Sequence, residues 1–210
     1  MKKLMASAVV LSMVLVGCGS SSKKNTKKPE IALITDSGGI NDKSFNQSAW
    51  EAVKEYGTKN DKGYKYYKPA SFDTAGYKDQ IKNAVDNGAK VVVLPGFKFA
   101  AALGTIQNEA KYKNVKFIAI DFTPTDEKDN PVDIAKNVYC ATYKEQQPGY
   151  LAGYAAVKDG YTKIGFMGGM ALPAVINYGY GFLQGANAAA KEMKVKDLLT
   201  KKLITIVMPV

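Results

Sequence analysis

Short apolar runs alternate with amphipathic segments over residues 30–120, and this alternation constrains the fold more than any other feature of the chain. Two of the runs, 91–94 and 115–120, are almost uninterrupted, which is typical of strands buried on both faces of a parallel sheet. The spacing predicts strands at 31–35, 64–68, 91–94 and 115–120, and helices at 44–57, 75–87 and 98–113. The order β-α-β-α-β-α-β indicates an α/β fold with helices on both faces of a parallel sheet.

The remaining sequence predicts a second, shorter set of elements. We expect strands at 135–141, 163–167 and 203–207, and helices at 145–157 and 173–193. Gly181, Gly185 and Ala189 follow one side of the last helix, so that side is predicted to approach a sheet closely. At the start of the first helix, Ser44 and Gln47 have the spacing of a capping box.

The first residues have the organisation of an export signal. Lys2 and Lys3 precede an apolar run from Leu4 to Val16, which is too short to span a membrane but suits a signal peptide. The run ends in LVGC, which resembles the bacterial lipoprotein box, so Cys18 is the predicted site of lipidation. An ordinary secretory signal with an incidental cysteine is the alternative. Residues 18–29 are polar and predict a flexible tether.

Two residue types are absent, and their absence narrows the function. All 29 basic residues are lysines against 19 acidic ones, and the lack of arginine argues against a nucleic-acid binder. The lack of histidine removes His-based zinc sites and Ser-His-Asp triads. Cys18 and Cys140 cannot form a disulfide framework, and Cys140 is predicted to be a small buried residue.

Polar and aromatic residues lie at the carboxyl ends of the predicted strands. In open α/β sheets this is the edge at which ligands bind. Asp36 and Asp121 end two strands, and residues 36–47 run from a strand through a glycine loop into a helix without being a phosphate-binding motif. There Phe45 can stack on a flat ligand and Asn46 can donate and accept hydrogen bonds. A simple helix cap with a core phenylalanine is the alternative.

Two further turns carry weaker signals. The segment 165–173 joins a strand to a helix through glycines, and Pro95–Phe97 places an aromatic at a strand end; tight turns explain both. Asp36 and Asp121 could serve as an acid/base pair, but no histidine, nucleophile or metal-ligand cluster completes a catalytic site. A carboxylate pair in a sugar-binding cleft is the simpler interpretation.

Several blocks together resemble the basic membrane protein family, the nucleoside-binding lipoproteins of bacterial ABC importers, including purine nucleoside receptors. The matching blocks are LVGC at 15–18, IALITDSGGINDKSFNQSAWEAV at 31–53, VVVLPGF at 91–97, FIAID at 117–121, EQQPGYLAGYAA at 145–156 and GFMGGMALPAVINYGYGFLQG at 165–185. The resemblance implies a type I periplasmic-binding-protein fold that holds a purine nucleoside between two lobes.

The resemblance also implies roles for individual residues and partners. Asp36, Asn46 and Asp121 would contact the nucleoside, Phe45 would stack on its base, and Ser37 is a weaker candidate. Phe97 and Met170 lie on the same edge by position. The implied partners are a nucleoside, ABC permease and ATPase subunits, and the extracytoplasmic face of the cell membrane through lipidated Cys18. No cofactor, metal, catalytic residue or nucleic acid is implied.

The expected organisation is a signal peptide at 1–17, a tether at 18–29, a first lobe at 30–140 and a partial second lobe at 141–210. Members of the family are longer, so the resemblance implies truncation at the C-terminus and an incomplete second lobe. Three alternatives stay open: a chain inactivated by truncation, a ligand-sensing regulatory lipoprotein of the same fold, and a nucleoside-acting enzyme.

Overall fold

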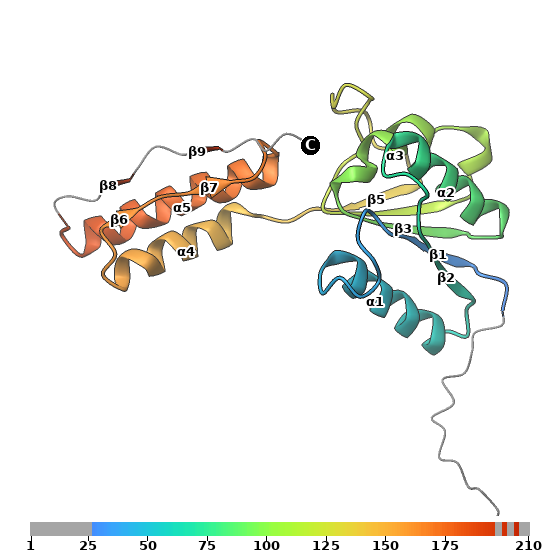
Figure 1. Ribbon diagram of the computed structural model, residues 1–210, viewed down its shortest axis with the longest axis horizontal. Helices are drawn as coiled ribbons and strands as arrows, with labels where there is room; N and C mark the ends of the chain where they lie inside the picture. The colour runs from blue at the N-terminus through green and yellow to red at the C-terminus, as the bar shows by residue number, and fades with distance from the viewer. Residues whose placement is uncertain (1–26, 196–198, 201–203, 206–210) are drawn as a thin grey trace, which may run out of the picture.

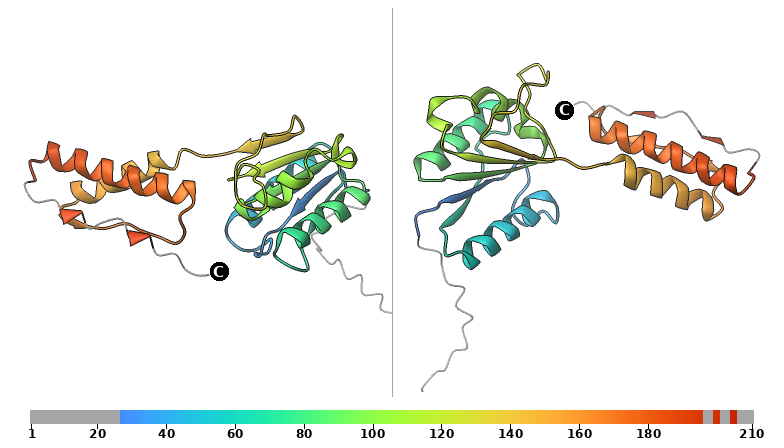
Figure 2. Two further views of the ribbon diagram at one scale, coloured as in Figure 1. Left: turned by 90° about the horizontal axis from the view of Figure 1, so that it is seen from above. Right: turned by 180° about the vertical axis from the view of Figure 1, so that it is seen from behind.

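The chain folds into two bodies that are joined by one extended passage (Figure 1). The computed structural model describes residues 27–195 and two short strands at 199–200 and 204–205. The first body is an α/β lobe and the second is built on a pair of helices, with residues 142–145 between them (Figure 2). The predicted signal peptide, with Cys18, lies outside the described residues.

The first body contains a five-stranded, wholly parallel sheet with the order β2-β1-β3-β4-β5. Its strands are β1 (Ile31–Ile34), β2 (Tyr64–Tyr67), β3 (Val91–Pro95), β4 (Lys116–Ile120) and β5 (Val138–Ala141). The central strands are buried because their runs are apolar at every position: Leu33, Val92 and Leu94 are fully inaccessible. The predicted parallel α/β architecture is confirmed.

Helices cover the two faces of this sheet unequally. On one face, α2 (Thr74–Asp86) and α3 (Ala100–Ile106) enclose the larger core around Phe99 and Phe117. On the other face, α1 (Phe45–Lys59) packs against β1, β2 and β3. Ile118 and Ile120 of β4 therefore stay only partly buried on the α1 face.

The single helix predicted over residues 98–113 is wrong. The segment instead forms the 3₁₀ turn η1 (Phe97–Phe99), then α3, then the 3₁₀ turn η2 (Ala110–Tyr112). Glu109, whose backbone is extended (φ −66°, ψ 140°), separates α3 from η2. Gln107, buried just after α3, donates to the carbonyl of Asp133 and accepts from the N–H of Ala135, 3.0 Å each.

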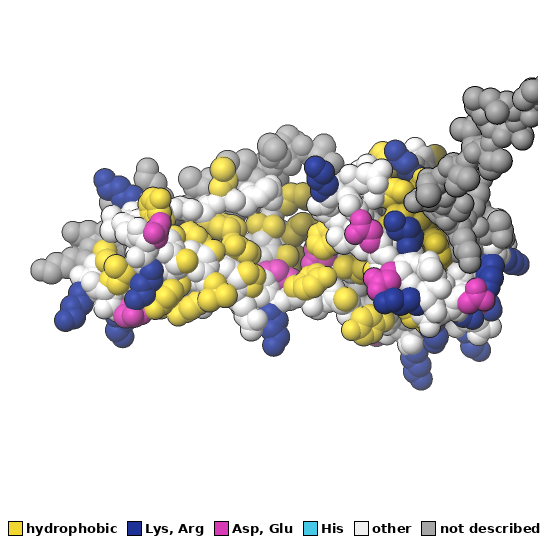
Figure 3. All heavy atoms as spheres, turned by 90° about the horizontal axis from the view of Figure 1, so that it is seen from below, with side chains coloured by type: hydrophobic (Ala, Val, Ile, Leu, Met, Phe, Trp, Pro, Cys, Tyr) yellow, Lys and Arg dark blue, Asp and Glu magenta, His cyan; other side chains and the backbone are white. Residues whose placement is uncertain are grey.

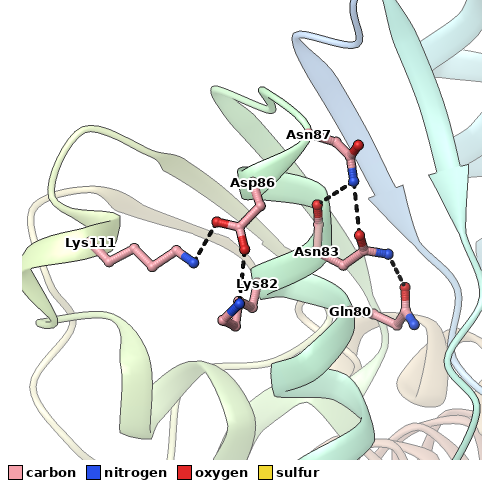
Figure 4. A network of polar contacts seen from close by, with 6 residues as sticks. All are labelled: Gln80, Lys82, Asn83, Asp86, Asn87 and Lys111. Carbon is pink, nitrogen blue, oxygen red and sulfur yellow. Dashed lines mark hydrogen bonds and ion pairs between the residues drawn. The ribbon is translucent and has the colours of Figure 1, made fainter.

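The outer end of α2 carries an exposed polar network (Figure 4). Asp86 forms ion pairs with Lys82 at 2.9 Å and with Lys111 of η2 at 2.6 Å. Asn87 donates to the carbonyl and the side-chain oxygen of Asn83, each at 2.8 Å. Exposed pairs of this kind contribute little to stability, but this one ties α2 to η2.

The second body is organised by α4 (Gln146–Lys158) and α5 (Pro173–Glu192), which lie side by side and run in the same direction. The predicted approach of the glycine side of α5 to a sheet is wrong, because that side packs on α4. A Cβ on Gly185 would lie 1.9 Å from the carbonyl oxygen of Tyr150, and a Cβ on Gly153 of α4 would lie 1.9 Å from that of Phe182. Glycines on both helices thus let the two backbones meet.

Two-residue strands accompany these helices. β6 (Lys163–Ile164) pairs in parallel with β8 (Leu199–Thr200), and β7 (Met167–Gly168) pairs with β9 (Ile204–Thr205). The strand predicted over 163–167 is therefore split in two. Of the strand predicted over 203–207, residues 204–205 form β9 and the others lie outside the described residues. No helix in the described part of the chain is both long and apolar enough to cross a bilayer.

Candidate ligand-binding site

Three neighbouring strands end at one edge of the first lobe. Asp36 follows β1, the turn Gly96–Phe97 follows β3, and Asp121 follows β4; in the sheet β1, β3 and β4 are adjacent. Residues 142–145 leave from the same ends of the strands, so this edge faces the second body (Figure 1). The predicted strand-end groups of the first lobe are thus on the edge where open α/β sheets bind ligands.

The start of α1 is capped by a different residue from the one the sequence pattern predicts. Ser44 is the N-cap position, but its side chain makes no capping hydrogen bond. Asp42 takes this role: its Oδ1 accepts from the backbone N–H of Ser44 at 2.8 Å and of Gln47 at 3.0 Å. The predicted capping box is wrong, because the carboxylate two residues earlier reaches the free N–H groups of the first turn.

The Asp36 carboxylate presents two different oxygens. Its Oδ1 accepts from the N–H of Gly38 and from Nδ2 of Asn46, both at 2.7 Å. Its Oδ2 points toward the end of β3, since a Cβ added to Gly96 would lie 3.9 Å from it. One oxygen is therefore engaged by the loop, and the other is directed along the strand ends.

Asn46 lies beneath the loop rather than on its surface, with 2% of the residue exposed. Its Oδ1 accepts from the backbone N–H of Asp36 at 3.1 Å, and its Nδ2 donates to Asp36 and Asp42. The ligand contact that the resemblance implies for Asn46 stays a prediction. The hydrogen bonds that the structure shows for its amide are all within the protein.

Two aromatic rings flank the strand ends. Phe45 at the start of α1 is 43% exposed and Phe97 after β3 is 40% exposed. Exposed apolar side chains are common on protein surfaces, so it is their position beside the strand ends that makes both rings candidates for stacking on a ligand. At the same edge, the ammonium group of Lys98 donates to Oγ of Ser37 at 2.8 Å, which joins the loop after β1 to the turn after β3.

Asp121 has an unusual backbone and a shifted acidity. Its φ is +67°, a left-handed conformation that residues with a side chain rarely adopt, and its N–H donates to the carbonyl of Ala141 at 2.8 Å. Burial raises the pKa of Asp121 above its ordinary value, and the negative charge of Glu145, next to α4, raises it further. Acids with shifted pKa values concentrate at functional sites.

The structure brings together six of the seven predicted site residues: Asp36, Ser37, Phe45, Asn46, Phe97 and Asp121. Met170 belongs to the second body, in the turn between β7 and α5. Two residues were missed: Lys98, which lies at this edge, and Asp42, which lies in the loop before α1. Asp42 was detectable, because an acidic residue shortly before a helix is an N-terminal signal.

A shallow cavity of about 370 Å³ lies on the other side of the glycine loop. Its lining, from the loop and from β2, comprises Thr35, Gly39, Ile40, Asn41, Asp42, Tyr66 and Lys68. None of the seven predicted residues lines it. We place the candidate site at the β1-β3-β4 edge instead, because the free carboxylate oxygen, the exposed rings and the interlobe passage meet there.

The groups at this edge are suited to hydrogen bonding and stacking. Among the described residues no group of three or more acidic, cysteine or histidine side chains is placed to hold a metal ion. Cys140 of β5 is partly buried, and burial raises the pKa of its thiol, which makes it a poor nucleophile at neutral pH. Hydrogen bonding and stacking are what the arrangement supports.

Known structures share this architecture. A solute-binding protein of an ABC transporter system from Aeropyrum pernix K1 superposes with a TM-score of 0.64 at 20% sequence identity, over 84% of this chain and 47% of that one. The fold is therefore that of the type I periplasmic binding proteins, as predicted.

The sequence profile described as "ABC transporter substrate-binding protein PnrA-like" matches residues 28–201. The chain belongs to this family, which is the one that the sequence blocks resemble. The family consists of transporter substrate-binding proteins, which is the class of protein that the resemblance implied.

Two curated relatives show the extent of the match. The ABC transporter nucleoside-binding protein BmpA of Lactococcus lactis is 33% identical over 93% of this chain and 56% of its own length. Basic membrane protein A of Borreliella burgdorferi is 30% identical over 93% of this chain and 55% of its own length. The chain thus spans about half the length of the curated relatives it matches.

Proposed function

We propose that the chain binds a nucleoside at the carboxyl edge of β1, β3 and β4, as the substrate-binding part of an ABC importer. The observation that carries this proposal is the pairing of ring faces with carboxylates on one edge: Phe45 and Phe97 are each about two-fifths exposed beside Asp36 and Asp121. A heterocyclic base can stack on such a ring, and ribose hydroxyls can donate to carboxylate oxygens. The relative from Lactococcus lactis, named as nucleoside-binding, supports this choice of ligand.

In the proposed complex, the free Oδ2 of Asp36 and the Asp121 carboxylate accept hydrogen bonds from the ligand, and Phe45 stacks on its base. Ser37 lies at the same edge, held by Lys98. Met170 reaches the ligand only from the second body, so its contact depends on how the two bodies close. A purine is the preferred base, since the larger ring system gains more from stacking.

The proposed location is the extracytoplasmic face of the cell membrane. The signal sequence and Cys18 would provide a lipid anchor, and the polar residues up to 29 would provide the tether. From there the protein would deliver nucleoside to the permease and ATPase subunits of the importer. Relatives named as basic membrane proteins support a membrane location.

Isothermal titration with inosine, guanosine, adenosine and cytidine tests the proposal. The expected result is micromolar binding of the purine nucleosides, and Phe45→Ala should weaken it about 5- to 150-fold, the equivalent of one stacked base. Tyr56→Ala is the matched control: Tyr56 is also an exposed aromatic of α1, about 16 Å further along the helix, and should leave binding unchanged. Equal effects of the two variants, or no binding by the unmodified chain, would contradict the proposal.

A further inference from the structure

We infer that Asp42 is a positioning residue, which sets the orientation of the Asp36 carboxylate through the buried side-chain amide of Asn46. The inference rests on the proposed function, because it takes Asp36 as the group that meets the ligand. Asp42 does not touch the strand-end edge itself, and its effect on binding is transmitted by one amide.

The connection is made by hydrogen bonds that converge on Asn46. Its Nδ2 donates to Oδ1 of Asp36 and to Oδ2 of Asp42, each at 2.7 Å. Its Oδ1 accepts from the backbone N–H of Asp36 at 3.1 Å. Both hydrogens of the amide group are therefore used, one on each carboxylate.

Asp42 is itself held firmly. Besides the amide of Asn46, its two oxygens accept from the backbone N–H groups of Ser44, Asn46 and Gln47 at the start of α1. The positive end of the helix dipole favours a carboxylate at this position. The rigid first turn of α1 thus anchors Asp42, and Asp42 in turn fixes which way the Asn46 amide faces.

These hydrogen bonds fix the orientation of the Asp36 carboxylate. Two donors, Gly38 N–H and Asn46 Nδ2, hold its Oδ1, and its Oδ2 is left to face Gly96 and the strand ends. A carboxylate free to rotate would lose conformational entropy on meeting a ligand, whereas this one is already oriented. The network thereby assigns the ligand-facing role to one oxygen.

The hydrogen-bond network of Asp36, Asp42 and Asn46 packs closely against Gly38 and leaves no room there for a side chain. A Cβ there would lie 2.7 Å from Nδ2 of Asn46, 3.0 Å from Oδ2 of Asp42 and 3.2 Å from Oδ1 of Asp36. The next residue, Gly39, has open space within 4 Å. Only the first of these adjacent glycines is packed against the network.

Four substitutions, two of them also combined, test the inference with inosine as the probe. Asp42→Asn keeps an oxygen that can cap α1 but turns an NH₂ group toward Nδ2 of Asn46, donor against donor. It should lower the urea midpoint modestly, because the charge and the Oδ2 acceptor of the Asn46 N–H are lost, and it should raise the Kd for inosine about tenfold. In the Asp36→Ala background the same change should add less than about twofold, because the group it positions is gone. Gly38→Ala should weaken binding and Gly39→Ala should not.

A readout without ligand separates this inference from the proposed function. In ¹H–¹⁵N spectra the side-chain NH₂ of Asn46 should exchange slowly with solvent, and Asp42→Asn should speed this exchange while the exposed Asn108 stays fast. Fast exchange in the unmodified chain, or an unchanged inosine Kd in a folded Asp42→Asn variant, would overturn the inference. Slow exchange without any inosine binding would overturn the proposed function and support the network.

Discussion

At the scale of single residues, the candidate site depends on partly or fully buried side chains that hold the loop after β1 in place. Asp42 and Asn46 connect the first turn of α1 to the loop after β1, and this loop presents Asp36. Buried polar groups are stable only when their hydrogen bonds are made, so a change at one of them is felt by the others. Phe45 is more exposed than Asn46, and its side chain takes no part in these hydrogen bonds.

The protonation of Asp42 makes this cap dependent on pH. Burial by itself would raise the pKa of Asp42, but hydrogen bonds from the Asn46 amide and from the N–H groups of Gln47 and Ser44 outweigh it and lower the pKa. A carboxylate whose pKa is lower in the folded than in the unfolded protein stabilises the fold at pH values above its unfolded-state pKa. This stabilisation is lost as the pH falls through its folded-state pKa.

Asp42→Ala should therefore destabilise the chain by about 1 kcal/mol at pH 7, with the difference shrinking below about pH 4. Urea unfolding at pH 7 and pH 3 measures it. Glu127→Ala, which removes an exposed loop carboxylate, is the control and should change little at either pH. A cost at Asp42 that is the same at both pH values would contradict the prediction.

At the scale of elements, the pair of α4 and α5 depends on backbone contact. Gly149 and Gly153 of α4 face the carbonyl oxygens of Tyr178 and Phe182, where an added Cβ would lie 2.2 Å and 1.9 Å away. Such contacts allow Cα–H···O interactions and bring the helix axes close together. Reciprocal contacts from Gly181 and Gly185 make the interface equally tight on both helices.

Gly153→Ala should force the two helices apart. Although alanine favours a helix by about 1 kcal/mol over glycine, overlap with a backbone oxygen cannot be relieved by a rotamer change, so the net effect is destabilisation by about 1–3 kcal/mol. Hydrogen exchange of the amides of α4 and α5 measures it. Gly165→Ala, where the added carbon meets nothing within 4 Å, should leave that exchange unaltered, and equal effects would argue against the contact.

At the scale of the whole molecule, apolar surface remains open in the described part of the chain. Tyr139 of β5, opposite the partly buried Ile118 of β4, is 68% exposed, and Leu151 of α4 is 66% exposed. Figure 3 shows hydrophobic side chains gathered along one face of the second body, with lysines around its margin. Contiguous surfaces of this kind promote association.

The chain should therefore associate in a concentration-dependent way, and the double variant Tyr139→Lys with Leu151→Lys should reduce that association. Sedimentation velocity over a hundredfold concentration range measures it. Thr162→Lys adds a charge at an exposed polar position and controls for the general effect of charge. A strictly monomeric unmodified chain, or equal behaviour of the variants, would refute the prediction.

The elements that were predicted well are those with a strong local signal. The apolar run of β3 and the helical spacing of α2 and α5 determine their structure from neighbouring residues alone. The segment 98–113 was predicted poorly, since its break after α3 accompanies hydrogen bonds from Gln107 to a loop some 26–28 residues away. Long-range hydrogen bonds of this kind leave no periodicity in the sequence.

The parallel α/β lobe and the strand ends that carry Asp36, Phe97 and Asp121 could be read from the sequence, because apolar runs and helical spacing are local properties. The family was recognised from the resemblance of several sequence blocks. Three features became visible only in the folded chain: Asp42 caps α1, Asn46 lies under the loop, and the glycines of α5 contact a helix instead of a sheet. Such features depend on hydrogen bonds and backbone contacts between residues that are distant in the sequence. These contacts form only when the helices and strands pack together.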